Sequence, residues 1–251
     1  MPKSRVEHHQ IIRNIQIISS VLEGWYLGVE SFSKMLRREA DHIWEGILGH
    51  PFLIEMERGD LPLDKFRFYV KQDYSYLMEF ARCLGIATAK VDDEEVMRAL
   101  ASLLNASLTV EVEMLERLSE KLGIPKDQLK IAEPAPTNLA YTRHLLSVAY
   151  SGTVGEIMAA MLPCMWSYQE IGEKLGESKS IGKQPIYQEW AATYRSQEYI
   201  ELVDWYRNLV DRFASDSGDL VREKMRRHFV LSSRYEYMFW DMAYRGEAWP
   251  I

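Results

Sequence analysis

The chain has 251 residues, of which 47% are hydrophobic and 27% are charged, a balance typical of a globular protein with a large buried core. Its net charge of −7 argues against nucleic acid as a partner, because nucleic-acid-binding domains usually carry a basic excess. No apolar run approaches the roughly 20 residues of a membrane span, so we expect no membrane partner.

The cysteines and the amino terminus indicate the compartment. Cys83 and Cys164 are too few for a disulfide framework and favour a reducing environment. Lys3 and Arg5 are followed by residues 7–10, Glu-His-His-Gln, where a signal peptide would need an apolar run. We therefore expect a cytoplasmic protein.

Helical spacing of apolar residues begins near the amino terminus. Residues 6–23 predict a short amphipathic helix that ends at Gly24. No chemistry is visible in this segment. We expect residues 1–30 to form a helical extension that packs on the body of the protein or on a neighbouring subunit.

The next segment predicts a longer helix and a short one. Apolar residues recur at helical spacing from Ser31 to Leu48, and Gly49-His50-Pro51 closes this helix. Residues 52–56 predict a short turn of helix before the sequence Gly59-Asp-Leu-Pro62, and Pro62 opens a long helix.

One residue of that long helix is unexpected. Aromatic and aliphatic residues up to Ala87 form a broad apolar face, and Asp73 lies on the same face beside Tyr76. Burying a carboxylate without partners costs several kcal/mol. Asp73 must therefore be paired, hydrogen-bonded or directed into a wet pocket.

Most of the sequence in the middle of the chain predicts helices and a loop with a structural role. Residues 92–122 begin with an acidic cap and form a helix rich in Glu and Leu, to which we assign no chemistry. Residues 124–136 contain three prolines and predict a loop. Thr137 is expected to cap the following helix, which carries Tyr141 and ends at Gly152.

A cysteine lies within the most apolar helix. The capping-box pattern of residues 153–156 predicts a helix start, and apolar residues then cover nearly all sides, which places the helix in the core. Pro163 should bend this helix; if a fresh turn begins there, the positive end of that turn favours the thiolate of Cys164. Tyr168 shares the face of Cys164. Buried cysteines are more often structural, so this pattern alone does not make Cys164 a nucleophile.

The last part of the chain predicts three helices. Pro185 starts one that carries Tyr194, and residues 196–214 form the second. The final helix places Glu236 among four aromatic residues, where the pKa of a carboxyl group should rise. Alternatively, Glu236 accepts a buried hydrogen bond or pairs with Arg234.

These elements define the fold class. No segment alternates apolar and polar residues with a period of two, and no glycine-rich phosphate loop occurs. The connections are short throughout. We therefore predict one all-α domain over residues 31–251.

Five separated motifs resemble the TenA family, thiaminase II. They are His50-Pro-Phe52, Gly59-Asp-Leu-Pro62, the stretch Phe66 to Leu77, the stretch Leu162 to Tyr168, and the stretch Tyr235 to Trp240, in the family's order and spacing. The likeness runs from about Ser31 to Tyr244. It implies a haem-oxygenase-like helical bundle, usually a homotetramer, without metal or cofactor.

The resemblance also implies an activity. The family hydrolyses aminomethylpyrimidine to hydroxymethylpyrimidine and ammonia in thiamin salvage, with thiamin a poorer substrate. By this resemblance Cys164 is the nucleophile, Glu236 protonates the leaving amine, and Asp73 binds the amidine edge of the pyrimidine. The implied aromatic contacts are Tyr76 and Tyr141 near the thiol, Tyr168 and Tyr194 on substrate or leaving group, and Phe239 on the ring.

The residue types suit this chemistry independently. Tyrosine hydroxyls and a helix start can lower the pKa of a thiol and so raise its thiolate fraction. An amine leaves only when it is protonated, which requires an acid that still holds its proton near neutral pH. Glu236 in an aromatic wall meets that requirement.

Two other readings compete. Glu39-Ala-Asp-His42 has the Glu-x-x-His spacing of di-iron bundles, but the sequence has no second copy, and a metal-dependent oxidase is disfavoured. A regulatory or ligand-binding protein would keep Asp73 and the aromatic residues but would not need Cys164 or Glu236. No helix-turn-helix signal supports direct contact with DNA.

Overall fold

Every regular element in the part of the chain that the structure describes, residues 30–251, is helical. The structure is a computed structural model, and the predicted helix at 6–23, with nearly all of the predicted extension, lies outside the described residues. None of the described helices is long and apolar enough to cross a membrane. The elements are α2 (Phe32–Glu39), α3 (Asp41–Leu48), α4 (Pro51–Arg58), α5 (Leu63–Lys90), α6 (Glu94–Ala106), the π-helical turn η1 (Ser107–Glu111), α7 (Val112–Lys121), α8 (Lys126–Lys130), α9 (Pro136–Ser151), α10 (Val154–Glu177), the 3₁₀ turn η2 (Ser180–Lys183), α11 (Pro185–Tyr194), α12 (Gln197–Ser215) and α13 (Asp219–Arg245).

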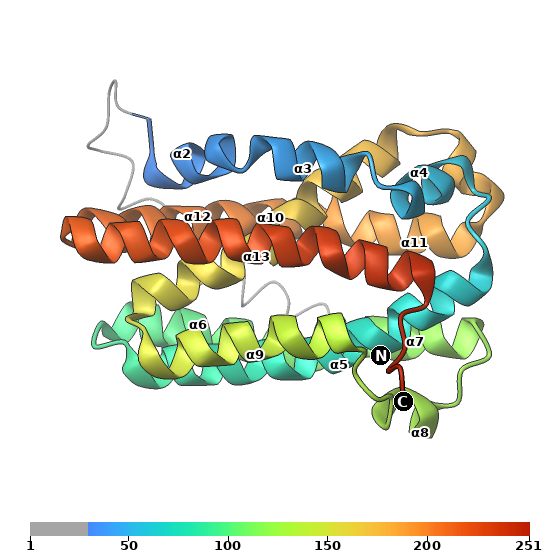
Figure 1. Cartoon of the computed structure of the whole chain (residues 1–251), viewed down its shortest axis with the longest axis horizontal. Coiled ribbons are helices and arrows are strands. Elements are labelled where there is room, and N and C mark those ends of the chain that lie inside the picture. Colours follow the sequence, from blue (N-terminus) through green and yellow to red (C-terminus); the bar gives the residue numbers. More distant parts are fainter. Residues whose placement is uncertain (1–29) are drawn as a thin grey trace.

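Helix α13 runs through the middle of the molecule (Figure 1). Helices α2 and α3 lie on one side of it, and the layer of α5, α6 and α9 lies on the other. Helix α10 packs against α13 more extensively than any other pair of described helices pack together. The α10–α13 contact is therefore the centre of the bundle.

The sequence of α10 explains its central place. The Thr153 hydroxyl accepts a hydrogen bond from the Glu156 N–H, and the Glu156 carboxylate accepts one from the Thr153 N–H, so the predicted capping box is confirmed. Most residues of the helix are buried, as predicted. The helix nevertheless continues through Pro163 to Glu177 without a new start. Cys164 therefore lies in the interior of a helix, and the expected positive helix end beside it is absent.

A buried amide connects α5 to the segment before α9. The Gln72 side chain donates to the Glu133 carbonyl at 3.0 Å and accepts from the Ala135 N–H at 2.9 Å. The Asn138 amide group donates to the same Gln72 oxygen at 2.9 Å. Buried polar groups are stable only when satisfied in this way. These bonds fix the start of α9 against α5.

Three predicted boundaries were wrong. The segment 31–48 forms two helices because the backbone turns at the buried Ala40, where φ is −87° and ψ is 6°. The predicted helix over 92–122 is interrupted by the π-helical turn η1. The predicted loop 124–136 contains the short helix α8, which follows Pro125.

Thr137 does not cap α9. That helix begins at Pro136 with Ala135 as its N-cap, and no side chain caps it. The Thr137 N–H and hydroxyl instead donate to the Glu247 carboxylate at 2.8 and 3.1 Å. The Trp249 indole N–H donates to the Pro134 carbonyl at 3.1 Å. The residues after α13 are thereby tied to the start of α9.

Helices α10 and α11 approach most tightly at Gly172. A Cβ atom at this position would lie 2.9 Å from the carbonyl carbon and the Cβ of Tyr194, and 3.0 Å from the backbone nitrogen of Arg195. Real Cβ atoms do not come so close to backbone atoms, so the contact needs glycine. Gly85, in the interior of α5, has only the Leu104 Cδ2 atom nearby, at 3.9 Å.

We expect Gly172→Ala to destabilise the protein although alanine favours helix. Displacing the α11 backbone should cost about 1–3 kcal/mol, as overpacking does. The matched Gly85→Ala change has room for a methyl group and should stabilise the protein by up to about 1 kcal/mol. Urea unfolding of both variants measures the difference. Equal free energies of unfolding would contradict the close approach.

Candidate active site

One pocket lies among α5, α6, η1, α7, α10, α11 and α12, and the empty space in it, including the part open to solvent, is about 490 Å³. Leucine, methionine and phenylalanine side chains form part of the lining. The polar lining residues are Asp73, Tyr76, Glu111, Cys164, Tyr168, Tyr194 and Tyr199. A pocket that is mostly apolar with a few converging polar groups is the usual form of a small-molecule site.

Asp73 is both hydrogen-bonded and directed into this pocket, which are two of the three outcomes predicted for it. The Tyr69 hydroxyl donates to its Oδ2 atom at 3.1 Å. Burial raises the pKa of Asp73 to about 7; the Tyr69 hydrogen bond acts in the opposite direction, and the charge of Glu111 raises it further. Asp73 can therefore accept or donate a hydrogen bond near neutral pH.

Tyr69 was not predicted as part of the site. Its side chain is fully buried and does not line the pocket. Its hydroxyl oxygen lies 3.1 Å from that of Tyr168 as well as 3.1 Å from Asp73, so it joins α5 to α10. The signal was present in the sequence, because Tyr69 precedes Asp73 by four residues and shares its helix face.

Cys164 lies on the pocket wall, but the expectation of a lowered thiol pKa was wrong. Burial raises the pKa of Cys164 well above its usual value, and the charge of Glu236 raises it further. An interaction with the Tyr76 hydroxyl lowers the pKa of Cys164, but the geometry of that interaction falls short of a hydrogen bond. The thiol therefore holds its proton at neutral pH in this structure.

Glu236 is buried on α13, and its pKa is raised as predicted. Burial is the largest cause and brings the pKa to about 8, while the hydrogen bond from Tyr141 lowers it and Asp73 raises it. The Tyr141 hydroxyl donates to the Glu236 Oε1 atom at 2.6 Å. The alternative partner Arg234 is exposed. The buried hydrogen bond and the raised pKa thus occur together.

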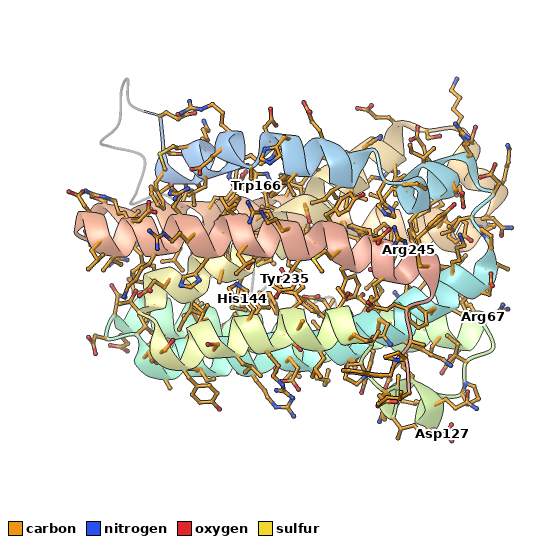
Figure 2. All side chains as sticks on the ribbon, viewed as in Figure 1. Arg67, Asp127, His144, Trp166, Tyr235 and Arg245 are labelled. Carbon is orange, nitrogen blue, oxygen red and sulfur yellow. The ribbon has the colours of Figure 1, made fainter. Side chains whose placement is uncertain are left out.

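A stack of rings holds Tyr141 in place. The Tyr141 ring stacks on Tyr235 with centroids 5.1 Å apart, and Tyr235 stacks on His144 at 5.6 Å. His144 and Tyr235 are seen side by side between α9 and α13 in Figure 2. Because its ring is fixed between two helices, Tyr141 presents its hydroxyl to Glu236 in one orientation.

The eight residues predicted for the site divide into two groups. Asp73, Tyr76, Cys164, Tyr168 and Tyr194 line the pocket, whereas Tyr141, Glu236 and Phe239 do not. The second group lies behind Tyr76, whose ring centroid is 5.2 Å from that of Tyr141 and 5.7 Å from that of Phe239. Cys164 and Glu236 are still near enough for the carboxylate charge to raise the thiol pKa. The structure therefore brings all eight side chains into one region, and their roles remain predictions.

Two polar residues of the pocket lining were missed. Tyr199, in the first turn of α12, lines the pocket and donates to the Met165 carbonyl at 3.0 Å. Glu111, the last residue of η1, also lines the pocket, although the sequence assigned its helix to the scaffold. Neither residue stands out in the sequence. Glu111, for example, is one of several glutamates in the same predicted helix.

The structure does not support a metal site at Glu39 and His42, the two residues behind the alternative of a metal-dependent oxidase. Glu39 pairs with Arg226, and His42 is exposed. Within residues 30–251, no three His, Cys, Asp or Glu side chains are grouped so that they could hold a metal ion.

The comparison with protein families decides the assignment. Residues 37–246 match the model of the TENA/THI-4/PQQC family. The chain belongs to this family. The match covers the described bundle from α2 to the end of α13, so the family resemblance predicted from five motifs is confirmed.

Relatives of this TenA-family chain cover almost its whole described length. An aminopyrimidine aminohydrolase of Halalkalibacterium halodurans is 40% identical over 219 residues, which are 87% of this chain and 98% of the relative. One of Bacillus subtilis is 39% identical over 218 residues, 87% of this chain and 92% of the relative.

Solved structures support the fold. A TenA homologue from P. horikoshii superposes with a TM-score of 0.80 at 37% identity, covering 86% of this chain and 100% of that one. A protein from Shewanella denitrificans described as having a haem-oxygenase-like fold superposes with a TM-score of 0.70 at 11% identity, over 87% of this chain and 94% of that one. The predicted all-α, haem-oxygenase-like bundle is confirmed.

The raised pKa of Glu236 predicts how stability depends on pH. As the pH rises from about 4.5 to about 8, the unfolded chain releases the Glu236 proton and the folded chain keeps it, so this group lowers the free energy of unfolding. Glu236→Gln removes the effect. The variant should be more stable than the original protein at pH 8, by on the order of a few kcal/mol, and the gain should vanish near pH 4.

Urea unfolding at pH 4, 6 and 8 measures this. The control is Glu113→Gln, which removes the same charge from an exposed site on α7. A gain for Glu236→Gln that does not change with pH would refute the buried, protonated carboxyl.

Proposed function

We propose that this chain is an aminopyrimidine aminohydrolase of the thiaminase II type. It would hydrolyse a C–N bond and convert 4-amino-5-aminomethyl-2-methylpyrimidine and water to the 5-hydroxymethyl compound and ammonia. The observation that carries the proposal is the 40% identity to an aminopyrimidine aminohydrolase over 98% of that protein. The pocket supports it with a thiol, carboxyl groups and tyrosine side chains in its lining.

Asp73 is proposed to bind the amidine edge of the pyrimidine. That edge offers an amino group, which donates hydrogen bonds, beside a ring nitrogen, which accepts one. A carboxyl group with a pKa of about 7 can match both functions, because its protonated oxygen donates and its other oxygen accepts. The hydrogen bond from Tyr69 supports this role by fixing one oxygen. Tyr168 and Tyr194, with centroids 4.9 Å apart, provide aromatic surface for the substrate.

Cys164 is proposed to begin the reaction by adding to the ring. Since the thiol holds its proton in this structure, we propose that it adds across a ring C=N bond. The sulfur bonds to carbon, and the thiol proton moves to the ring nitrogen through a neighbouring carboxyl group. This addition interrupts the aromaticity of the ring and forms a covalent intermediate, which divides one difficult displacement into easier steps.

Glu236 is proposed to be the acid for the second step. The ring nitrogen lone pair drives out the exocyclic amine, which leaves as ammonia with the Glu236 proton, and an exocyclic methylene remains. Water then adds its oxygen to the methylene carbon and returns a proton to Glu236. Loss of the thiol restores the aromatic ring. The pKa of about 8 supports this role, because the acid holds its proton at neutral pH.

The remaining features of the proposal concern the setting of the enzyme. We propose a homotetramer that acts in thiamin salvage in the cytoplasm and contacts neither nucleic acid nor membrane. The two cysteines are unpaired in the structure, which is consistent with a reducing compartment.

An ammonia-release assay tests the proposed function. Aminomethylpyrimidine, thiamin and formylated aminopyrimidine are compared side by side, and aminomethylpyrimidine should give the highest rate. Cys164→Ser should lower ammonia release to the background rate, because an alcohol adds to the ring far more slowly than a thiol, while calorimetry should still detect pyrimidine binding.

Cys83→Ser is the matched control. Cys83 is fully buried in α5, burial raises its pKa to about 12, and it does not line the pocket, so this variant should keep full activity. Turnover retained by Cys164→Ser, or no ammonia from the original protein, would overturn the proposal.

Glu236→Gln tests the proposed acid. The amide keeps the acceptor for Tyr141 but has no proton to donate, so kcat should fall by about 10²- to 10⁴-fold with little change in substrate affinity. Steady-state kinetics and calorimetry separate the two quantities. A large loss of affinity at near-normal kcat would make Glu236 a binding residue.

A further inference from the structure

Glu111 is an ionisable pocket residue to which the proposed mechanism gives no role. It ends the five-residue π-helical turn between α6 and α7, and such turns are frequent at functional sites. Leu103, Met114 and Leu115 line the pocket from the neighbouring helices, so the carboxyl group stands in an otherwise apolar part of the wall. An ionisable group is costly to keep in apolar surroundings, so the position of Glu111 indicates a role for its carboxyl group.

The partners of Glu111 within the chain are weak. Its Oε1 atom accepts one hydrogen bond, from the buried Ser107 hydroxyl, at 3.3 Å. No lysine, arginine or histidine is among the lining residues of the pocket in the described chain. The carboxyl group therefore lacks a cation to balance its charge, and burial raises its pKa to about 7.

The other charged groups of the pocket do not supply that balance. Ionised Glu111 raises the pKa of Asp73, and Asp73, Glu111 and Glu236 all raise the pKa of Cys164. The ionisable side chains that line the pocket in the described chain are thus all acids, and none of them can become a cation. A positively charged ligand would stabilise the ionised form of Glu111, whereas a neutral ligand would not.

A second polar group of the pocket also lacks a full partner within the described chain. The Tyr76 hydroxyl is buried, belongs to a pocket-lining residue, and has no hydrogen-bond partner among the described residues. Leaving such a group unsatisfied costs about 1–3 kcal/mol. A ligand with a polar atom near Tyr76 and a positive charge near Glu111 would satisfy both groups.

We propose that Glu111 is a specificity-determining residue that pairs with the positively charged substituent of the substrate. The inference rests on the proposed function. The primary amine of the substrate is an ammonium group in neutral solution and binds in that form; it loses its extra proton to solvent before the reaction, and Glu236 supplies a proton as the amine leaves. Glu111 selects substrates whose substituent is cationic, a protonated amine or a quaternary nitrogen, over substrates in which that nitrogen is acylated and neutral. Its role is in binding, and no bond forms or breaks at Glu111.

Binding measurements in a Cys164→Ser background test this, because that background prevents turnover. Calorimetry compares aminomethylpyrimidine, which is cationic, with its N-formyl derivative, which is neutral, before and after Glu111→Gln. We expect the dissociation constant of the cationic compound to rise at least tenfold and that of the neutral compound to change less than twofold.

Glu113→Gln is the matched control, since it removes a charge two residues away at an exposed position and should change neither constant. Equal weakening of both compounds by Glu111→Gln, or no weakening of either, overturns the inference. Should Glu111→Gln fail to fold, Glu111→Asp is measured instead; its shorter side chain must also lower the preference for the cation, and an unchanged preference overturns the inference.

The outcome is separable from that of the proposed function. Ammonia release by the original protein tests the function, whereas the ratio of the two dissociation constants tests Glu111. If no ammonia is released but Glu111→Gln lowers the preference for the cationic compound, the proposed function fails and Glu111 is only a binding residue for the cationic group.

Discussion

The removal of ionisable groups from water where α10 and α13 meet is the constraint on which the site depends. Cys164 on α10 and Glu236 on α13 belong to the two helices that make the largest contact of the bundle, and burial is the largest cause of the raised pKa of each. The same packing that forms the core therefore keeps both protons in place. Stability and reactivity are opposed here, since a carboxyl group that is protonated only because it is buried lowers the stability of the fold as the pH rises.

The side chains around this contact come from helices far apart in the sequence, and bonds between helices fix their geometry. Tyr69 joins Asp73 on α5 to Tyr168 on α10, and Tyr141 joins α9 to Glu236 on α13. Each tyrosine is itself held by ring packing. A pocket built in this way is preorganised, because its polar groups already have their orientation before a ligand arrives.

Sequence patterns were sufficient for most of the helices and drew attention to two carboxyl groups of the candidate site, while the family resemblance supplied the other proposed site residues. Capping patterns and helical periodicity located the helices, and the oddity of a carboxylate on an apolar face singled out Asp73. Glu236 was found by the same reasoning. Features that depend on tertiary packing were missed: the π-helical turn that places Glu111 in the pocket has no local sequence signal, and the continuation of α10 through Pro163 is a consequence of its burial on nearly all sides. The thiol pKa was misjudged for the same reason, since a helix start at Pro163 was assumed.

The tie between the end of the chain and α9 bears on how the protein can be handled. Glu247 and Trp249 hold Thr137 and Pro134, and Tyr141 follows only one turn later on the same helix. An affinity tag or fusion partner joined directly after residue 251 would be attached two residues after Trp249, close to these hydrogen bonds, of which those at Thr137 lie one helical turn from Tyr141. For kinetic work, a cleavable affinity tag is best placed elsewhere, or joined through a flexible linker that leaves the hydrogen bonds of Glu247 and Trp249 intact.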